Sequence, residues 1–218
     1  MDVRARLEQR VAARHLLDHP FYQRWSSGEL TGEELREYAR QYWHYTLAFP
    51  TFVSGVHSGS DDFALRQALL ENLVEEERGN ENHPELWLRF CDALGLARED
   101  VLASIPNDAT RALIATMRTI ARDGGTHEGL ASLFAYESQV PSVAKAKIEG
   151  LAKHYAMESE RDIAFFSVHE TADVFHSDTS AALLERICDS EEKRAASEVA
   201  AQKTLDAWYG FLDAVTVN

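Results

Sequence analysis

Residues 165–176 read FFSVHETADVFH. The spacing i, i+4 and i+7 places His169, Asp173 and His176 on one face of an α-helix, and the preceding turn of that face carries Phe165 and Phe166, which are typical of a buried core. Burying two imidazoles and a carboxylate costs about 1–3 kcal/mol for each unpaired polar group. A metal ion would pair them, because His nitrogen and Asp oxygen are ligands of Fe, Mn or Zn. The alternative is a solvated or salt-bridged helix face.

Helical periodicity continues through almost the whole chain, and no convincing alternating strand pattern interrupts it. Pro20 suits a first helical turn, Thr31 and Glu34 match a capping box, Pro50 should kink its helix, and Gly95 is a plausible C-terminal stop. We predict helices over residues 3–18, 19–28, 31 to beyond 53, 61–94 (loosened at 79–80), 108–122, 126–154 (interrupted at Pro141), 159–176, 180–188 and 191–212. No linker, low-complexity tract or repeat divides them, so residues 1–218 are predicted to form a single all-α domain.

Composition restricts the function classes. The 218 residues are enough for one domain with a sizeable core. The formal net charge of −14 argues against nucleic acid or an anionic membrane surface as the main partner, since both attract Lys and Arg. The first residues, MDVRAR, lack the apolar segment of a signal peptide, and no apolar run reaches membrane-spanning length. Cys91 and Cys188 lie in apolar helical patterns typical of reduced core thiols. We therefore expect a cytoplasmic soluble protein.

A second polar interruption of an apolar face occurs in residues 69–77, LLENLVEEE. The apolar stripe passes through Leu69 and Leu73 and then meets Glu76. His83 follows Glu76 at i+7, so the two would face the same side if the helix were roughly continuous across Gly79. A solvated face is the alternative, since acidic runs are usually exposed.

A third interruption occurs in residues 130–137, LASLFAYE, where Leu130, Leu133 and Phe134 define a buried face and Glu137 is the next residue on it. The combined set holds three carboxylates and three imidazoles: Glu76, His83, Glu137, His169, Asp173 and His176. This inventory is typical of two metal ions bridged by carboxylate inside a helix bundle. Nitrogen and oxygen donors without thiolate favour Fe or Mn over a structural zinc site.

These residues resemble the CADD-like proteins of the haem-oxygenase-like dimetal oxidase group, relatives in fold of TenA and PqqC. The resemblance covers nearly the whole chain. Its strongest matches are HPFY at 19–22, LREYA at 35–39, AFP at 48–50, Glu76 with NH at 82–83, YESQVP at 136–141, HETADV at 169–174 with His176, and YGFLD at 209–213. All six metal-ligand positions of that family are filled here, whereas TenA and PqqC do not carry the complete set. TenA-type thiaminases use a cysteine nucleophile, and neither cysteine of this chain lies in residues 136–141.

The resemblance implies a haem-oxygenase-like helical bundle and a self-sacrificing synthase of 4-aminobenzoate for folate biosynthesis. In such proteins a tyrosine of the chain is oxidatively cleaved to give the aromatic ring, and a lysine is implicated as nitrogen donor. The matching positions are Tyr22 and Lys147. The implied cofactors are two metal ions, Fe/Fe or Fe/Mn, with O₂ and an external reductant, because activated O₂ is needed to break a tyrosine Cα–Cβ bond. The resemblance also implies a homodimer.

Other interpretations remain open at this point. Without the resemblance, Tyr22 would be a packed aromatic and Lys147 a surface lysine. The tyrosines Tyr38, Tyr42, Tyr45 and Tyr136 are rival aromatic donors or radical relays. One alternative function is a dimetal oxidase of the same fold that turns over a free amino or fatty acid. A second is a non-enzymatic interaction protein. Metal content separates this last class from the oxygenases, and the fate of Tyr22 separates the two kinds of oxygenase.

Overall fold

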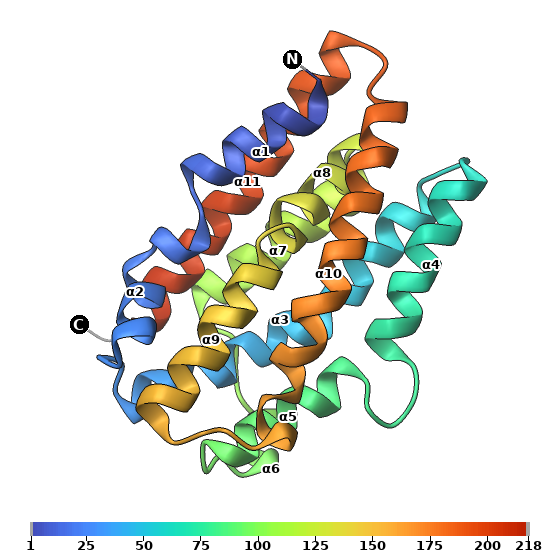
Figure 1. Ribbon diagram of the computed structural model, residues 1–218. Helices are drawn as coiled ribbons and strands as arrows, with labels where there is room; N and C mark the ends of the chain where they lie inside the picture. Colours follow the sequence, from blue (N-terminus) through green and yellow to red (C-terminus); the bar gives the residue numbers. More distant parts are fainter. Residues whose placement is uncertain (1, 217–218) are drawn as a thin grey trace.

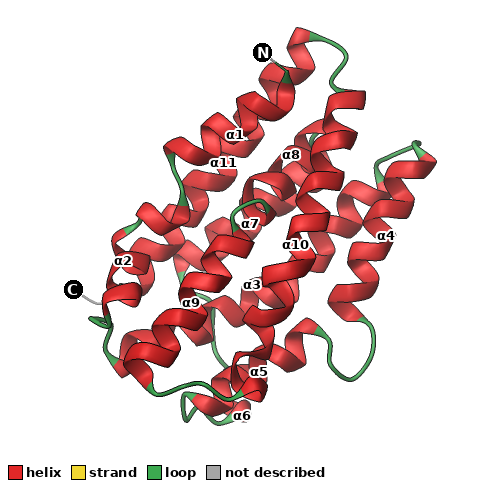
Figure 2. Cartoon of the chain, viewed as in Figure 1, coloured by secondary structure: helices red, strands yellow, loops and turns green. Residues whose placement is uncertain are grey.

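A computed structural model describes residues 2–216 of the chain, apart from the side chains of residues 171, 172, 174 and 175. All regular structure in this described part is helical, as predicted (Figure 2). The elements are α1 (Val3–Ala13), a 3₁₀ turn (Leu16–Asp18), α2 (Pro20–Ser27), α3 (Gly32–Ser58), α4 (Phe63–Glu77), α5 (His83–Ala93), α6 (Arg98–Leu102), α7 (Asp108–Asp123), α8 (Thr126–Glu137), α9 (Val140–Tyr155), α10 (Glu160–Ile187) and α11 (Glu191–Val215).

The long helices form a bundle around one continuous hydrophobic core (Figure 1). Helix α1 lies along α11 at one edge of the bundle, and α4 lies against α3 at the opposite edge. Helices α8, α9 and α10 pack between them, and α5 and α6 cover one end. Among the described residues, no helix is both long and apolar enough to cross a bilayer. The two cysteines are buried and form no disulfide, as expected of core thiols.

Several predicted helix ends are confirmed by their local geometry. Pro20 is the first residue of α2, and Gly28 ends that helix with φ of +77°, a left-handed conformation that glycine adopts without steric cost. The Thr31 side chain accepts the Glu34 amide while the Glu34 carboxylate accepts the Thr31 amide, so the capping box is complete. Gly95 follows α5 with φ of +76°. Helix α3 continues through Pro50, where the kink stays a prediction.

Four predicted boundaries are wrong. The first helix ends at Ala13, and the chain turns so that the Leu16 amide donates to the Gln139 side chain over 2.8 Å. The predicted helix 61–94 is two helices separated by residues 78–82. The break expected at Pro141 occurs two residues earlier, and Pro141 lies in the first turn of α9, where its missing N–H costs nothing. The helices predicted over 159–176 and 180–188 are one helix, because the buried face continues through Ser180 and Ala181. The short helix α6 was not predicted.

Helices α2 and α9 approach each other closely at Gly150. A Cβ atom on Gly150 would lie 2.7 Å from Cδ1 of Trp25, so only glycine leaves room for this indole. The Trp25 Nε1–H also donates to the backbone carbonyl of Lys147 over 3.2 Å. This contact places Tyr22, one turn before Trp25, opposite the side chain of Lys147, one turn before Gly150.

The contact predicts opposite effects for two glycine substitutions. Gly150→Ala should lower the free energy of unfolding by about 1–3 kcal/mol, because the added methyl group overpacks the Trp25 ring. Gly210→Ala should raise it by about 0.5–1 kcal/mol, since Gly210 is exposed within α11 and a Cβ there would meet no atom within 4 Å. Urea unfolding followed by circular dichroism measures both. Equal stability of the two variants would contradict the close approach of α2 and α9.

Candidate metal centre

Three of the six predicted ligands meet between α4, α5 and α10. Glu76, His83 and His169 are buried, and their ligand atoms lie within 4.8 Å of one another. The Nδ1 of His83 lies 2.7 Å from Oε2 of Glu76. The Nδ1–H of His169 donates to the Phe165 carbonyl over 2.6 Å, which leaves Nε2 as the nitrogen with a lone pair. We call these three residues the first triad.

The other three predicted ligands form a second triad between α8 and α10. Glu137, Asp173 and His176 are buried and also present ligand atoms within 4.8 Å of one another. The Asn72 side-chain amide donates to Oε1 of Glu137 over 2.7 Å. The remaining oxygens, Oε2 of Glu137 and Oδ2 of Asp173, are buried without a hydrogen-bond partner. Such orphaned carboxylate oxygens are costly unless a cation or proton neutralises them.

Glu76 and His83 lie close together for a different structural reason from the one predicted. Glu76 and His83 do face each other, but not along a continuous helix: Glu76 lies in the last turn of α4, and His83 is the first residue of α5, which is capped by Asn82. Residues 78–82 form the loop that connects these two helices. The predicted single face of α10 is observed, and it supplies His169 to one triad and both Asp173 and His176 to the other.

Burial and mutual repulsion make the two triads electrostatically strained without a cation. Burial raises the pKa of Glu137, and the neighbouring Asp173 raises it further. Burial also raises the pKa of Asp173 itself. Burial alone would lower the pKa of His176, but the hydrogen bond to Asp173 and the charge of Glu137 raise it. Burial, followed by His83, keeps the pKa of His169 well below its ordinary value, so this imidazole is neutral and ready to be a ligand.

These donors fit a pair of divalent cations. Each triad combines carboxylate oxygen with imidazole nitrogen and no thiolate, the set that suits Fe or Mn. Two positive ions would neutralise the buried carboxylates and use the two orphaned oxygens. A solvated helix face, the alternative interpretation of residues 165–176 and 69–77, is excluded by the burial of the candidate ligands there.

Two small cavities border the first triad, and both are lined by His169. One also contacts Glu76 and Asp173. The other contacts Tyr22 and Lys147. Each has a volume of about 10 Å³, room for about one water molecule. Tyr22 and Lys147 therefore share a buried space with a residue of the first triad.

Lys147 is not the surface lysine that sequence patterns alone suggest. It is 4% exposed, and Tyr22 is 2% exposed. The Lys147 Nζ donates to the Tyr38 hydroxyl over 2.7 Å and lies 5.4 Å from the centroid of the Tyr22 ring. Burial lowers the pKa of Lys147 to about 7 and raises the pKa of Tyr22. The pair thus consists of a protonated phenol and an amine that is half neutral at pH 7.

Sequence reasoning missed Asn72 and Glu75 beside the second triad. Asn72 is buried on the same stripe as Glu76, four residues earlier, and that spacing was the available signal. Glu75 lies 3.2 Å from Nε2 of His176, and its place in an acidic run gave no indication of this contact. Among the rival tyrosines, Tyr42 and Tyr136 hydrogen-bond each other and line both cavities.

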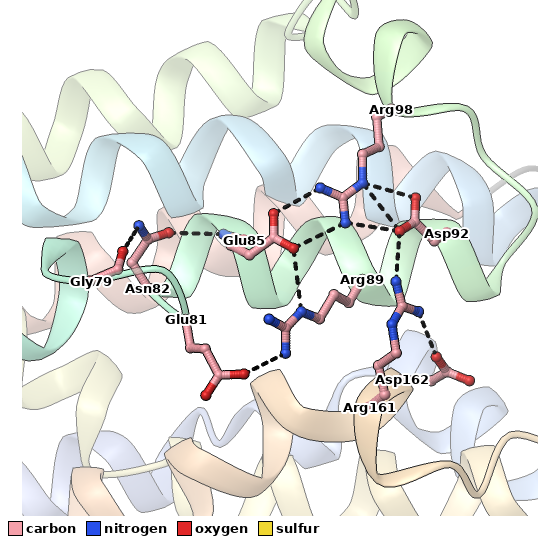
Figure 3. A network of polar contacts seen from close by, with 9 residues as sticks. All are labelled: Gly79, Glu81, Asn82, Glu85, Arg89, Asp92, Arg98, Arg161 and Asp162. Atoms are coloured by element: carbon pink, nitrogen blue, oxygen red, sulfur yellow. Dashed lines mark hydrogen bonds and ion pairs between the residues drawn. The ribbon is translucent and has the colours of Figure 1, made fainter.

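Ion pairs connect α5 and α10, two of the helices that carry the first triad. Figure 3 shows a network along α5, in which Arg98 bonds to both Glu85 and Asp92. Asp92 also accepts from Arg161 in the first turn of α10 over 3.2 Å. Because single exposed ion pairs contribute at most about 1 kcal/mol, the network matters mainly for orientation. It holds the start of α10 against α5, the helices of His169 and His83.

Comparison with known proteins agrees with this fold. The chain is similar to a domain of unknown function with a haem oxygenase-like fold from Shewanella denitrificans, with a TM-score of 0.79 at 21% identity, covering 98% of this chain and 88% of the other. It is also similar to a CADD-like protein from Nostoc punctiforme, with a TM-score of 0.75 at 19% identity, covering 98% and 95%. The predicted haem-oxygenase-like helical bundle is confirmed.

The sequence comparisons extend over nearly the whole chain. A protein of Nitrosomonas europaea named 4-aminobenzoate synthase is 43% identical over 217 residues, covering 95% of this chain and 88% of that protein. Residues 5–218 match the model of the TENA/THI-4/PQQC family. The chain belongs to the TENA/THI-4/PQQC family.

Proposed function

We propose that this protein is a dimetal oxygenase that makes 4-aminobenzoate for folate biosynthesis from its own Tyr22, with Lys147 as amino donor. A relative named 4-aminobenzoate synthase, 43% identical to the chain, supports the product. The observation that carries the proposal is the single buried cavity bordered by Tyr22, Lys147 and His169. A ring, a nitrogen and a residue of the first triad thus lie next to one another inside the protein.

The six triad residues would hold the metals: Glu76, His83 and His169 one cation, and Glu137, Asp173 and His176 the other. When bound as Fe/Fe or Fe/Mn, the pair would supply activation of O₂ with electrons from an external reductant. Asn72 would keep Oε1 of Glu137 in place, and Oε2, which accepts no hydrogen bond, would remain available as a ligand atom.

Tyr22 is held in position by the surrounding aromatic rings. Its ring packs edge-on against Phe21, with centroids 5.3 Å apart, and tilted against Trp25, at 6.4 Å. The side chain is buried, and burial raises the pKa of the phenol, which therefore stays protonated. A reacting group fixed in the protein gains the proximity advantage of an intramolecular reaction.

Lys147 has the properties of an amino donor. Burial favours its neutral form, which carries the lone pair that a nucleophile requires. The Tyr38 hydroxyl accepts from the amine and lies 3.4 Å from the Tyr22 hydroxyl, so it connects the nitrogen with the oxygen that the amino group of the product must replace.

Two features disfavour the other function classes. A cavity of about 10 Å³ has no room for a free amino or fatty acid, because sites for such ligands measure some 300–1,000 Å³. An interaction protein gains nothing from burying six ionisable side chains, each of which costs free energy unless paired.

The first prediction of the proposal concerns metal binding. Metal-free protein titrated anaerobically with Fe²⁺ should bind two ions per chain and unfold at higher temperature, since ligand at 100 times its Kd adds about 2.7 kcal/mol of stability. His83→Ala and Asp173→Ala should each lose at least one ion, whereas the exposed His154→Ala should bind both. Elemental analysis and calorimetry measure these effects. Unchanged binding in both triad variants would refute the metal assignment.

The second prediction concerns Tyr22. Tyr22→Phe should keep its fold and both metals but release less than about one-tenth of the wild-type product, because the phenol on which the oxidant acts is missing. Wild-type protein should release at most one 4-aminobenzoate per chain, since a cleaved residue has no turnover step. Mass spectrometry should find the loss at residue 22, and ring label should pass from protein tyrosine into the product. Multiple turnovers with a free substrate would contradict the proposal.

The third prediction concerns the charge of Lys147. Product formation should increase as pH rises through about 7, because the amine then becomes neutral. The folded-state pKa lies below the unfolded one, so the destabilisation is complete below pH 7 and vanishes by about pH 10.5. Lys147→Met should therefore be more stable than wild type at pH 6, with the difference shrinking toward pH 10. A pH-independent difference in urea midpoints would contradict the burial of a titrating amine.

A further inference from the structure

We propose that the Tyr38 hydroxyl relays a proton between Lys147 and Tyr22 during the exchange of the ring oxygen for nitrogen. The inference rests on the proposed function and adds a residue to it. Tyr38 lies on α3, whereas Tyr22 and Lys147 lie on α2 and α9, so three helices converge at this point.

The contacts of one oxygen atom carry the inference. The Tyr38 hydroxyl accepts from Lys147 Nζ over 2.7 Å and lies 3.4 Å from the Tyr22 hydroxyl. It is thus within hydrogen-bond reach of both reacting groups, and the longer contact is of the kind that tightens during reaction. A hydroxyl is suited to a relay because it accepts one proton while donating its own.

Apart from the Tyr38 hydroxyl, the groups around the Lys147 amine are mainly aromatic rings. Lys147 Nζ lies 5–6 Å from the centroids of five aromatic rings: Tyr22, Trp25, Tyr38, Tyr42 and Phe166. No carboxylate of the described residues forms an ion pair with it within 4.0 Å. An amine in an aromatic enclosure needs a polar partner to deliver a proton, and Tyr38 is in position to be that partner.

The Tyr38 ring is held rigidly. It is fully buried and packs against Phe21 at 5.0 Å, Trp25 at 5.6 Å and Trp87 at 6.0 Å between ring centroids. Burial raises the pKa of Tyr38 far above its ordinary value, so the hydroxyl keeps a proton to donate. A fixed donor and acceptor avoids the reorganisation that a mobile water would require.

The exchange balances without electrons. The Lys147 nitrogen forms a bond to Cζ of Tyr22, and the bond from Cζ to the phenolic oxygen breaks. The nitrogen loses one proton, and the oxygen gains one and leaves as water. Tyr38 accepts the first proton and donates its own to the departing oxygen, so it ends the step unchanged. The nitrogen is then bonded to both Cζ of the ring and Cε of residue 147, and its release needs an oxidant, for which O₂ of the proposed function serves. O₂ takes two electrons and two protons from the Cε–Nζ bond and leaves as hydrogen peroxide, and hydrolysis of the resulting imine frees the aryl amine and leaves an aldehyde at Cε of residue 147.

The test is the fate of the ring in Tyr38→Phe. If oxidative cleavage proceeds while the exchange is blocked, the Tyr22 side chain takes up O₂ and leaves as 4-hydroxybenzoate in place of 4-aminobenzoate. We expect the ratio of amino to hydroxy product to fall at least tenfold, with bound metal retained and mass still lost at residue 22. Lys147→Met should show the same change in product, and Tyr155→Phe, which removes a hydroxyl bonded to the Leu30 carbonyl, should match wild type.

The outcomes separate this inference from the proposed function. A wild-type protein that keeps residue 22 intact and forms neither product under O₂ and reductant refutes the proposed function itself. A wild type that forms 4-aminobenzoate, beside a Tyr38→Phe variant with the same product ratio, refutes only the relay. The relay is also refuted if Tyr38→Phe binds metal but leaves Tyr22 uncleaved, because Tyr38 would then act in the oxidation.

Discussion

The carboxylates of Glu76, Glu137 and Asp173 lie inside a helical bundle that has little water to solvate them. Charge in such surroundings is costly unless it is paired. Imidazoles from α5 and α10 and the side-chain amide of Asn72 pair with these carboxylates. Two carboxylate oxygens still have no partner. The helices α4, α5, α8 and α10 thus enclose a site whose excess negative charge favours bound cations. This excess is the physical basis of the proposed metal pair.

The same bundle produces the opposite environment a short distance away. Around Lys147, aromatic rings replace the carboxylates, and the amine loses its proton more readily as a result. His169 borders both regions, since it belongs to the first triad and also lines the cavity of Tyr22. A carboxylate-rich site and an amine whose pKa is lowered by burial therefore lie side by side, with His169 bordering both.

Contacts outside the two triads and the cavity help to position the helices that carry the candidate site. The missing side chain of Gly150 lets Trp25 lie on α9, and the ion pairs of Asp92 hold α10 against α5. The ion pairs of Asp92 lie away from the proposed reaction, whereas the Trp25 ring also packs against Tyr22. Each feature fixes a helix that carries a residue of the candidate site. Such contacts explain how a tyrosine from α2 and a lysine from α9 come to share one small cavity.

Much of the fold could be predicted from the sequence because helix signals are local. The capping box of Thr31, the first-turn position of Pro20 and the glycine stops depend on neighbours within one turn. The break predicted after His176 was wrong. The polar residues that follow His176 are typical of a turn when only the local sequence is considered. The helix continues there because tertiary packing buries Ser180 and Ala181.

The sequence by itself determined which polar residues interrupt apolar faces, and thus the six candidates for a metal site, since helical periodicity specifies a face. Only the tertiary structure decided how the six divide into two triads, because that depends on the turn at residues 78–82 and on where α8 meets α10. The burial of Lys147 and its contact with Tyr38 were likewise beyond the sequence. A side chain's pKa and partners are set by helices distant along the chain, and no local pattern encodes them.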